Sequence, residues 1–386
     1  MSARRSWLLG AVPLVMLAVL VALVAGTGFL DFLRGGAPPV EDITFDRVTL
    51  APGTITVELV NGGPDPVTIA QVTVDEAYWA FTITPDATLG RLGRARLDIP
   101  YPWVEDESHQ IALLTSTGVT FEHEIAVARA SPTLGADFFG LFGLIGLYVG
   151  VIPVAIGLLW YPFLRRIGQR WLHFVLALTA GLLIFLGFDA LHEALETGAT
   201  VAGPYQGPLI VLVGMLGAIL ALQAVTGARA RVAGAEGRRT LAWLVALGIG
   251  LHNLGEGLAI GAAYALGEAA LGTFLIVGFM IHNSTEGLGI VAPIAHDRPA
   301  IRTLLGLGFL AGAPTILGAW IGGAAYSPVL ATLFLSVGAG AIAQVVMVLY
   351  GVVARETAGR PMWAPLTAGG LFAGLLVMYG TGLLVA

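Results

Sequence analysis

The sequence predicts an all-α bundle of membrane-spanning helices, preceded by one N-terminal transmembrane anchor and a small extracytoplasmic β-sandwich. Three observations support this fold class. Of the 386 residues, 56% are hydrophobic and only 11% are charged, whereas soluble domains carry about 25% charged residues. Apolar runs of about 20 residues, each long enough to cross a bilayer, recur along the chain. Between residues 40 and 130 the pattern changes to the short alternating runs of β-strands. A soluble enzyme is therefore excluded.

The composition also excludes several kinds of site and partner. The chain contains no cysteine, which rules out disulfides, thiolate metal sites and cysteine nucleophiles. It contains no lysine and no G-x-x-x-x-G-K-[ST] loop, so we expect neither nucleotide-driven chemistry nor a nucleic-acid partner. The formal net charge is −6, but residues 31–131 hold 15 acids against 6 arginines. The rest of the chain is therefore slightly positive.

The first predicted element is the transmembrane anchor, residues 1–31. Arg4 and Arg5 precede an uncharged stretch from Trp7 to Leu30. This stretch is longer than the apolar region of about 7–15 residues in a cleaved signal peptide. We therefore expect an uncleaved membrane helix.

The second predicted element is the β-sandwich, of immunoglobulin-like type, over residues 40–131. Alternating runs such as Thr54–Val60 are separated by turn sequences such as Asn61–Pro64. Several short strands at this spacing are typical of a sandwich. The prolines at 38–39 and 132 mark its borders.

The third predicted element is an eight-helix domain over residues 133–386. Its apolar segments are 136–160, 172–195, 207–227, 240–266, 270–294, 303–325, 329–353 and 363–385. Arginines occur only in alternate connections, and the positive-inside rule places those connections in the cytoplasm. The N-terminus is then inside, and the β-sandwich and C-terminus are outside, in the inner membrane of a prokaryote. The 53 glycines allow close helix packing and a homodimer.

One polar sequence motif occurs twice within the predicted membrane helices. His252, Asn253 and Glu256 recur thirty positions later as His282, Asn283 and Glu286. In each copy His and Glu are four residues apart, so they share a helix face. Each His lies about 18 Å along its helix from the predicted start. Because the two helices run antiparallel, we expect both copies to meet near the middle of the membrane.

Two imidazoles, two carboxylates and two amides form a ligand set for a divalent metal. Zn²⁺, Mn²⁺ and Fe²⁺ all accept nitrogen and carboxylate ligands, whereas Cu(I) prefers sulfur. The alternative is an interhelical hydrogen-bond cluster of histidine, asparagine and protonated glutamate. Duplication of the motif at matched depth favours the metal.

The paired motif on the fourth and fifth of eight spans resembles the ZIP (Zrt/Irt-like) family of metal transporters, in particular its bacterial GufA-like branch, over residues 133–386. The resemblance implies a binuclear metal centre. His252, Glu256, His282 and Glu286 would hold one ion, and Asn253 and Asn283 would hold a second with the two glutamates as bridges. Ala313 stands where relatives often carry a glutamate, so one or two ions are expected.

A second polar group lies at the end of the second span. Asp189, His192, Glu193 and Glu196 are expected near the outer surface, where they would form an entrance that attracts cations. A solvated helix end is the alternative. The sequence from His192 to Glu196 lacks the second histidine of a zinc-protease helix.

The predicted function is transport of divalent cations into the cytoplasm, with Zn²⁺ as the first candidate substrate and iron, manganese or cadmium as others. The protein is then not an enzyme, and its partners are metal ions and the lipid bilayer. Two alternatives remain. One is a metal-dependent intramembrane hydrolase, in which Glu256 or Glu286 activates a metal-bound water. The other is a membrane metal sensor that signals through the β-sandwich.

Overall fold

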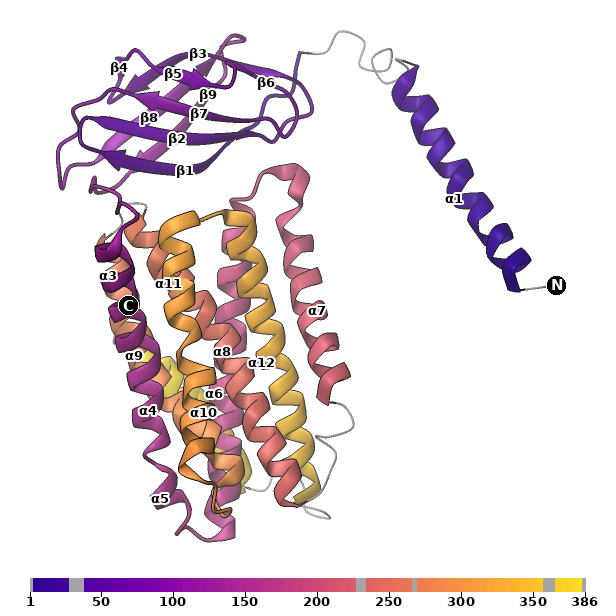
Figure 1. The fold of residues 1–386 in the computed structure, drawn as a ribbon, viewed down its shortest axis with the longest axis vertical. Helices are drawn as coiled ribbons and strands as arrows, with labels where there is room; N and C mark the ends of the chain where they lie inside the picture. Colours follow the sequence, from indigo (N-terminus) through magenta and orange to yellow (C-terminus); the bar gives the residue numbers. More distant parts are fainter. Residues whose placement is uncertain (1–2, 28–37, 227–233, 266–268, 357–364, 384–386) are drawn as a thin grey trace. The chain divides into compact units, whose positions relative to one another are not determined.

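The computed structural model describes residues 3–27, 38–226, 234–265, 269–356 and 365–383 (Figure 1). The chain divides into two units, Met1–Val40 and Glu41–Ala386. The first unit contains helix α1 (Ala3–Gly26), which has Pro13 inside it. Its apolar stretch is Ala11–Val24. The predicted anchor is therefore helical where it is described, and its role as an anchor stays a prediction; its residues 1–2 and 28–31 lie outside the described part of the chain.

The second unit begins with a region of short antiparallel strands. They are β1 (Ile43–Ala51), β2 (Thr54–Asn61), β3 (Val67–Val74), β4 (Ala77–Tyr78), β5 (Thr82–Thr84), β6 (Thr88–Leu89), β7 (Arg94–Ile99), β8 (His109–Thr115) and β9 (Thr120–Ile125). One sheet has the order β1-β2-β7-β5. The other has the order β4-β3-β8-β9, with β6 paired to β3. Both sheets contribute to one hydrophobic core, as in a sandwich.

Strand β2 shows why this segment folds in two layers. Ile55, Val57 and Leu59 are buried, whereas Glu58 between them is exposed. Successive side chains of a strand point to opposite faces, so an alternating sequence buries one face only. In β9 the same alternation exposes Glu122 and Glu124 and leaves His123 half-buried, where its ring stacks on Phe45 with centroids 5.1 Å apart. Burial lowers the pKa of His123 below its usual 6.5.

Asp75, which follows β3, forms hydrogen bonds to the loop before β8 and to the start of β8. Its Oδ2 accepts a hydrogen bond from the Tyr101 hydroxyl at 2.6 Å and lies 2.8 Å from His109 Nδ1. Its Oδ1 accepts one from the Gln110 amide at 2.9 Å. Partial burial alone would raise the pKa of Asp75, but these hydrogen bonds outweigh it and hold the pKa below 3.8. Burial and the bond to Asp75 raise the pKa of Tyr101 to about 12.

Replacing Asp75 by asparagine should therefore loosen this strand junction in a pH-dependent way. A depressed carboxylate pKa stabilises the folded state above the unfolded-state pKa, and this contribution is lost as the pH falls through the folded-state pKa. We expect Asp75→Asn to speed hydrogen–deuterium exchange of the peptide 109–115 in the full chain at pH 7, by an amount equivalent to about 1 kcal/mol. The difference from wild type should shrink as the pH falls through the folded-state pKa, which lies below 3.8. A difference that does not change with pH would contradict this explanation.

The remainder of the second unit is helical. Its helices are α3 (Ala136–Gly146), η1 (Leu147–Val151), α4 (Ile152–Leu158), α5 (Tyr161–Leu164), α6 (Gln169–Ala199), η2 (Gly203–Tyr205), α7 (Gly207–Thr226), α8 (Ala235–Ala265), α9 (Ala269–Val291), η4 (Ala292–Ile294), α10 (Ile301–Gly312), α11 (Pro314–Ala325), α12 (Pro328–Glu356) and α13 (Pro365–Leu383). Among the described residues, eight segments are long and apolar enough to cross a membrane, which confirms the eight predicted segments. Two of them are interrupted: η1 lies between α3 and α4, and α11 follows α10 after Ala313.

Helix α8 is the centre of the bundle, since 78% of the residues in its most apolar stretch of 18 residues are buried. It packs against α9, α10, α11 and α12. Glycines bring several backbones together. A methyl group on Gly257 of α8 would meet the main chain of α11, and one on Gly157 of α4 would lie 2.6 Å from the Cα atom of Gly287 in α9. Such close approaches are typical of helices packed in membranes.

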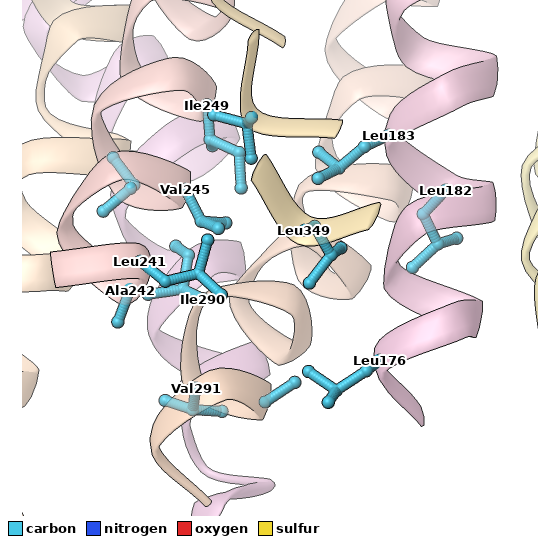
Figure 2. Packing of buried hydrophobic residues seen from close by; sticks show 14 of the residues in the cluster. Leu176, Leu182, Leu183, Leu241, Ala242, Val245, Ile249, Ile290, Val291 and Leu349 are labelled. Atoms are coloured by element: carbon cyan, nitrogen blue, oxygen red, sulfur yellow. The ribbon is translucent and has the colours of Figure 1, made fainter. Parts of the chain in front are cut away.

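A cluster of aliphatic side chains fills the bundle beyond the polar motifs (Figure 2). The side chains labelled in Figure 2 come from α6, α8, α9 and α12, and they include Val245 and Ile249 of α8, Ile290 of α9 and Leu349 of α12. Ile249 precedes His252 by three residues and Ile290 follows Glu286 by four. The cluster therefore separates the paired motif from the end of the bundle where Arg238 and Asp297 lie.

The β-strand region contacts the helical region through main-chain and side-chain hydrogen bonds. The Arg47 guanidinium donates to the carbonyl oxygen of Ala324 at 3.2 Å. The Ser131 hydroxyl donates to the carbonyl oxygen of Ala265 at 2.7 Å and accepts from the amide of Leu50 at 3.0 Å. The end of β1 and the ends of α8 and α11 are joined in this way.

Candidate metal centre

All six polar residues of the paired motif are buried inside the helical bundle. Three belong to α8 and three to α9. Their exposed fractions are 4% for His252, 0% for Asn253, 1% for Glu256, 8% for His282, 0% for Asn283 and 3% for Glu286. Ionisable groups at this depth are costly, so they need partners or a ligand to justify their position.

Glu256 is the residue on which the two histidines converge. His252 Nε2 lies 3.2 Å from Glu256 Oε1, as the i,i+4 spacing predicted. His282 Nε2, from the other helix, contacts the same oxygen, and the two imidazole centroids are 6.4 Å apart. One ligand atom from each of the three residues lies within 4.8 Å of the other two. A single cation between them would reach all three.

The two asparagines connect the motifs crosswise. Asn283 Nδ2 donates to Glu256 Oε2 at 3.0 Å, and Asn253 Nδ2 donates to Glu286 Oε2 at 3.3 Å. Each amide group also donates to a main-chain carbonyl oxygen, that of Val149 for Asn283 (3.0 Å) and that of Ala311 for Asn253 (3.1 Å). Each copy of the motif thus holds the carboxylate of the other.

The two accepting carbonyls lie at irregular points of their helices. Val149 belongs to the π-helical segment η1, and Ala311 lies just before the junction of α10 and α11 at Ala313. A π-helical turn disturbs the regular ladder of backbone hydrogen bonds and is frequent at functional sites. These irregularities place both carbonyls beside the paired motif.

Several buried oxygen atoms at the site have no hydrogen-bond donor. They are Asn253 Oδ1, Asn283 Oδ1, Glu286 Oε1 and Thr315 Oγ1. Thr315 is completely buried, and Gly150 leaves room for its hydroxyl, because a methyl group at Gly150 would collide with it. Most buried polar atoms in proteins are paired. The three unpaired oxygens of the motif residues, beside two imidazoles and a carboxylate, fit a divalent cation better than a purely hydrogen-bonded cluster.

The structure brings only some of the predicted ligands close together. His252, Glu256 and His282 form the close group, whereas Glu286 faces Asn253 and keeps one oxygen unpaired. Thr315 was not predicted. It lies on α11, and no spacing in the sequence relates it to the motif.

The predicted entrance residues lie on the last turns of α6. His192 Nε2 is 3.2 Å from Glu196 Oε1, and both side chains are largely exposed. Asp189 is also exposed, whereas Glu193 is half-buried. These four residues form an exposed acidic helix end with one carboxylate turned toward the bundle, and they do not join the close ligand group.

Comparison with known proteins does not identify the family of this chain. No protein-family model matches the chain, and no curated protein matches it significantly. The described part of the chain is a helical bundle with eight segments long and apolar enough to cross a membrane, a small β region and a buried His–Glu–His group that could hold a metal ion.

Proposed function

We propose that the protein transports divalent metal cations across a membrane, with Zn²⁺ as the first candidate substrate. One observation carries the proposal: three ligand atoms of His252, Glu256 and His282 lie within 4.8 Å of one another, buried between two helices of membrane length. The resemblance of the paired motif to the ZIP family supports it. A second ion on Asn253 and Asn283, with Glu256 and Glu286 as bridges, belongs to the same proposal.

The proposed path runs from the acidic end of α6 to the buried motif and then past the aliphatic cluster. Asp189, Glu193 and Glu196 would attract the cation. It would exchange its water for imidazole and carboxylate ligands at the motif. The aliphatic side chains around Ile249 and Leu349 would have to separate before it left. The arginine pattern favours an orientation with the β-sandwich and the acidic end of α6 outside the cell, so a path that begins at these carboxylates would lead inward.

Uptake of radioactive Zn²⁺ into proteoliposomes is the test. Wild-type protein should show saturable uptake, and Glu256→Ala and Glu286→Ala should abolish it, because each removes a carboxylate of the paired motif. Glu58→Ala, which changes an exposed carboxylate on β2, is the control. Zn²⁺ bound at the motif without flux would overturn transport and favour the sensor. Turnover of a lipid or peptide without flux would favour the hydrolase.

A further inference from the structure

Five exposed arginines gather at one end of the helical bundle, away from the paired motif. They lie on two connections that are far apart in the sequence. This basic surface consists of Arg165, Arg166, Arg170, Arg298 and Arg302. The first three lie between α5 and the first turn of α6, and the other two lie between η4 and the first turn of α10.

Two hydrogen bonds hold these connections together. The Tyr161 hydroxyl, at the start of α5, donates to the carbonyl oxygen of Asp297 at 2.5 Å. His296 Nε2 donates to the carbonyl oxygen of Ile167 at 3.1 Å. The partners are 136 and 129 residues apart. The fold therefore combines two short basic runs into one surface.

The charge of this surface is not compensated by a neighbouring acid. Asp297 is the only acid in residues 160–174 and 292–305, and both of its oxygens accept hydrogen bonds from Arg238, at 3.1 and 2.5 Å. Within the described ranges, none of the five arginines has an ion pair or a side-chain hydrogen bond. Their guanidinium groups are free to bind an anion.

Large aromatic side chains flank the first connection. Trp160, Phe163 and Trp171 are 51%, 55% and 57% exposed. Trp160 and Phe163 pack edge to face with centroids 5.8 Å apart. Exposed aromatic rings at the ends of membrane helices lie at the level of the lipid headgroups. The arginines beside them are then placed at the level of the phosphates.

We propose that the basic surface binds the phosphodiester group of anionic phospholipids. Guanidinium groups pair with phosphate oxygens through two parallel hydrogen bonds, and basic pockets between membrane helices bind anionic headgroups. The hydrogen bonds between the two connections fix the spacing of their arginines. Such a preformed set of guanidinium groups binds a headgroup better than several arginines on one flexible segment. The proposal requires that the helices cross a membrane, and it does not depend on metal transport.

The test measures lipid binding to the full chain purified in detergent, with phosphatidylglycerol as the probe and phosphatidylcholine as the neutral comparison. Native mass spectrometry counts the retained lipids, and a thermal melt reports stabilisation. Wild type should retain phosphatidylglycerol selectively. Arg165→Gln/Arg166→Gln and Arg298→Gln/Arg302→Gln should each raise its Kd at least fivefold, since both connections contribute. Arg165→Lys/Arg166→Lys and Arg298→Lys/Arg302→Lys keep the charge but not the paired guanidinium hydrogen bonds, so they should raise the Kd less than the glutamine variants do.

The matched control is Arg91→Gln/Arg129→Gln, which removes two exposed arginines from the β-strand region and should leave lipid binding unchanged. Unchanged selectivity in both basic-surface variants would overturn the proposal, as would equal retention of the two lipids by wild type. Stabilisation by inorganic phosphate equal to that by phosphatidylglycerol would also overturn it, by showing that a free anion is bound instead. Size-exclusion chromatography verifies that each variant is folded.

Discussion

Replacing Glu256 by glutamine should raise the Kd for Zn²⁺ at least 100-fold. One oxygen of Glu256 contacts the Nε2 atoms of both histidines, and its second oxygen accepts a hydrogen bond from Asn283. Glutamine keeps the size of the side chain but removes the negative charge that a cation requires. Altering groups that merely support metal ligands already costs 10- to 100-fold in affinity, so loss of the shared ligand should cost more.

Glu286→Gln and Glu58→Gln are the comparison variants for the Zn²⁺ affinity of Glu256→Gln. Glu286 lies outside the close ligand group, so its substitution should raise the Kd by about tenfold. Glu58 is exposed on β2, and its substitution should have no effect. Equilibrium dialysis of Zn²⁺ against the detergent-solubilised full chain measures all three. Equal losses for Glu256 and Glu286 would show that both carboxylates hold the same ion, and wild-type affinity in Glu256→Gln would refute the site.

The second large effect is expected from a single methyl group at Gly157. A Cβ atom there would press on the carbonyl oxygen of Ser284 and lie 2.6 Å from the Cα atom of Gly287. The obstacle is main chain on both sides, which cannot rotate away. Gly157→Ala should therefore push α4 and α9 apart and lower the free energy of unfolding by about 1–3 kcal/mol. Because Ser284 and Gly287 flank Glu286, metal affinity should fall as well.

Gly140→Ala is the matched control for this substitution. Gly140 lies in α3, and no heavy atom lies within 4 Å of the position of its added methyl group. Alanine also has the higher helix propensity. Thermal melts in detergent should show a lower Tm for Gly157→Ala and an unchanged or slightly higher Tm for Gly140→Ala. Equal melting temperatures in all three proteins would contradict the packing argument.

The elements of the fold could be predicted because their signals are local. Length and apolarity determine which segments cross a membrane, and period-two alternation identifies strands such as β2. The interruptions at η1 and at Ala313 each lie next to a proline, Pro153 or Pro314, which lacks the amide hydrogen that continues a helix. Apolarity alone does not locate these breaks, whereas the prolines indicate them. For α1 the described residues agree with a helix, and its role as an anchor stays a prediction.

The candidate site was predictable only in part, for a similar reason. The four-residue spacing of His252 and Glu256 predicts their contact, because one helix turn brings them together. The contact of His282 with Glu256 rather than Glu286 depends on how two helices are rotated against each other, which spacing does not determine. Likewise, no spacing in the sequence indicates that Asp297 binds Arg238 across 59 positions of the chain.

The antiparallel arrangement of the two motifs has a consequence for direction. Helices α8 and α9 carry the same order of histidine, asparagine and glutamate from opposite ends of the bundle. The ligands do not keep this symmetry, because both histidines contact Glu256 while Glu286 lies outside the close group. For the proposed transport, the two directions therefore differ at the centre itself. They also differ in its surroundings, with carboxylates on the last turns of α6 and aliphatic side chains near Leu349.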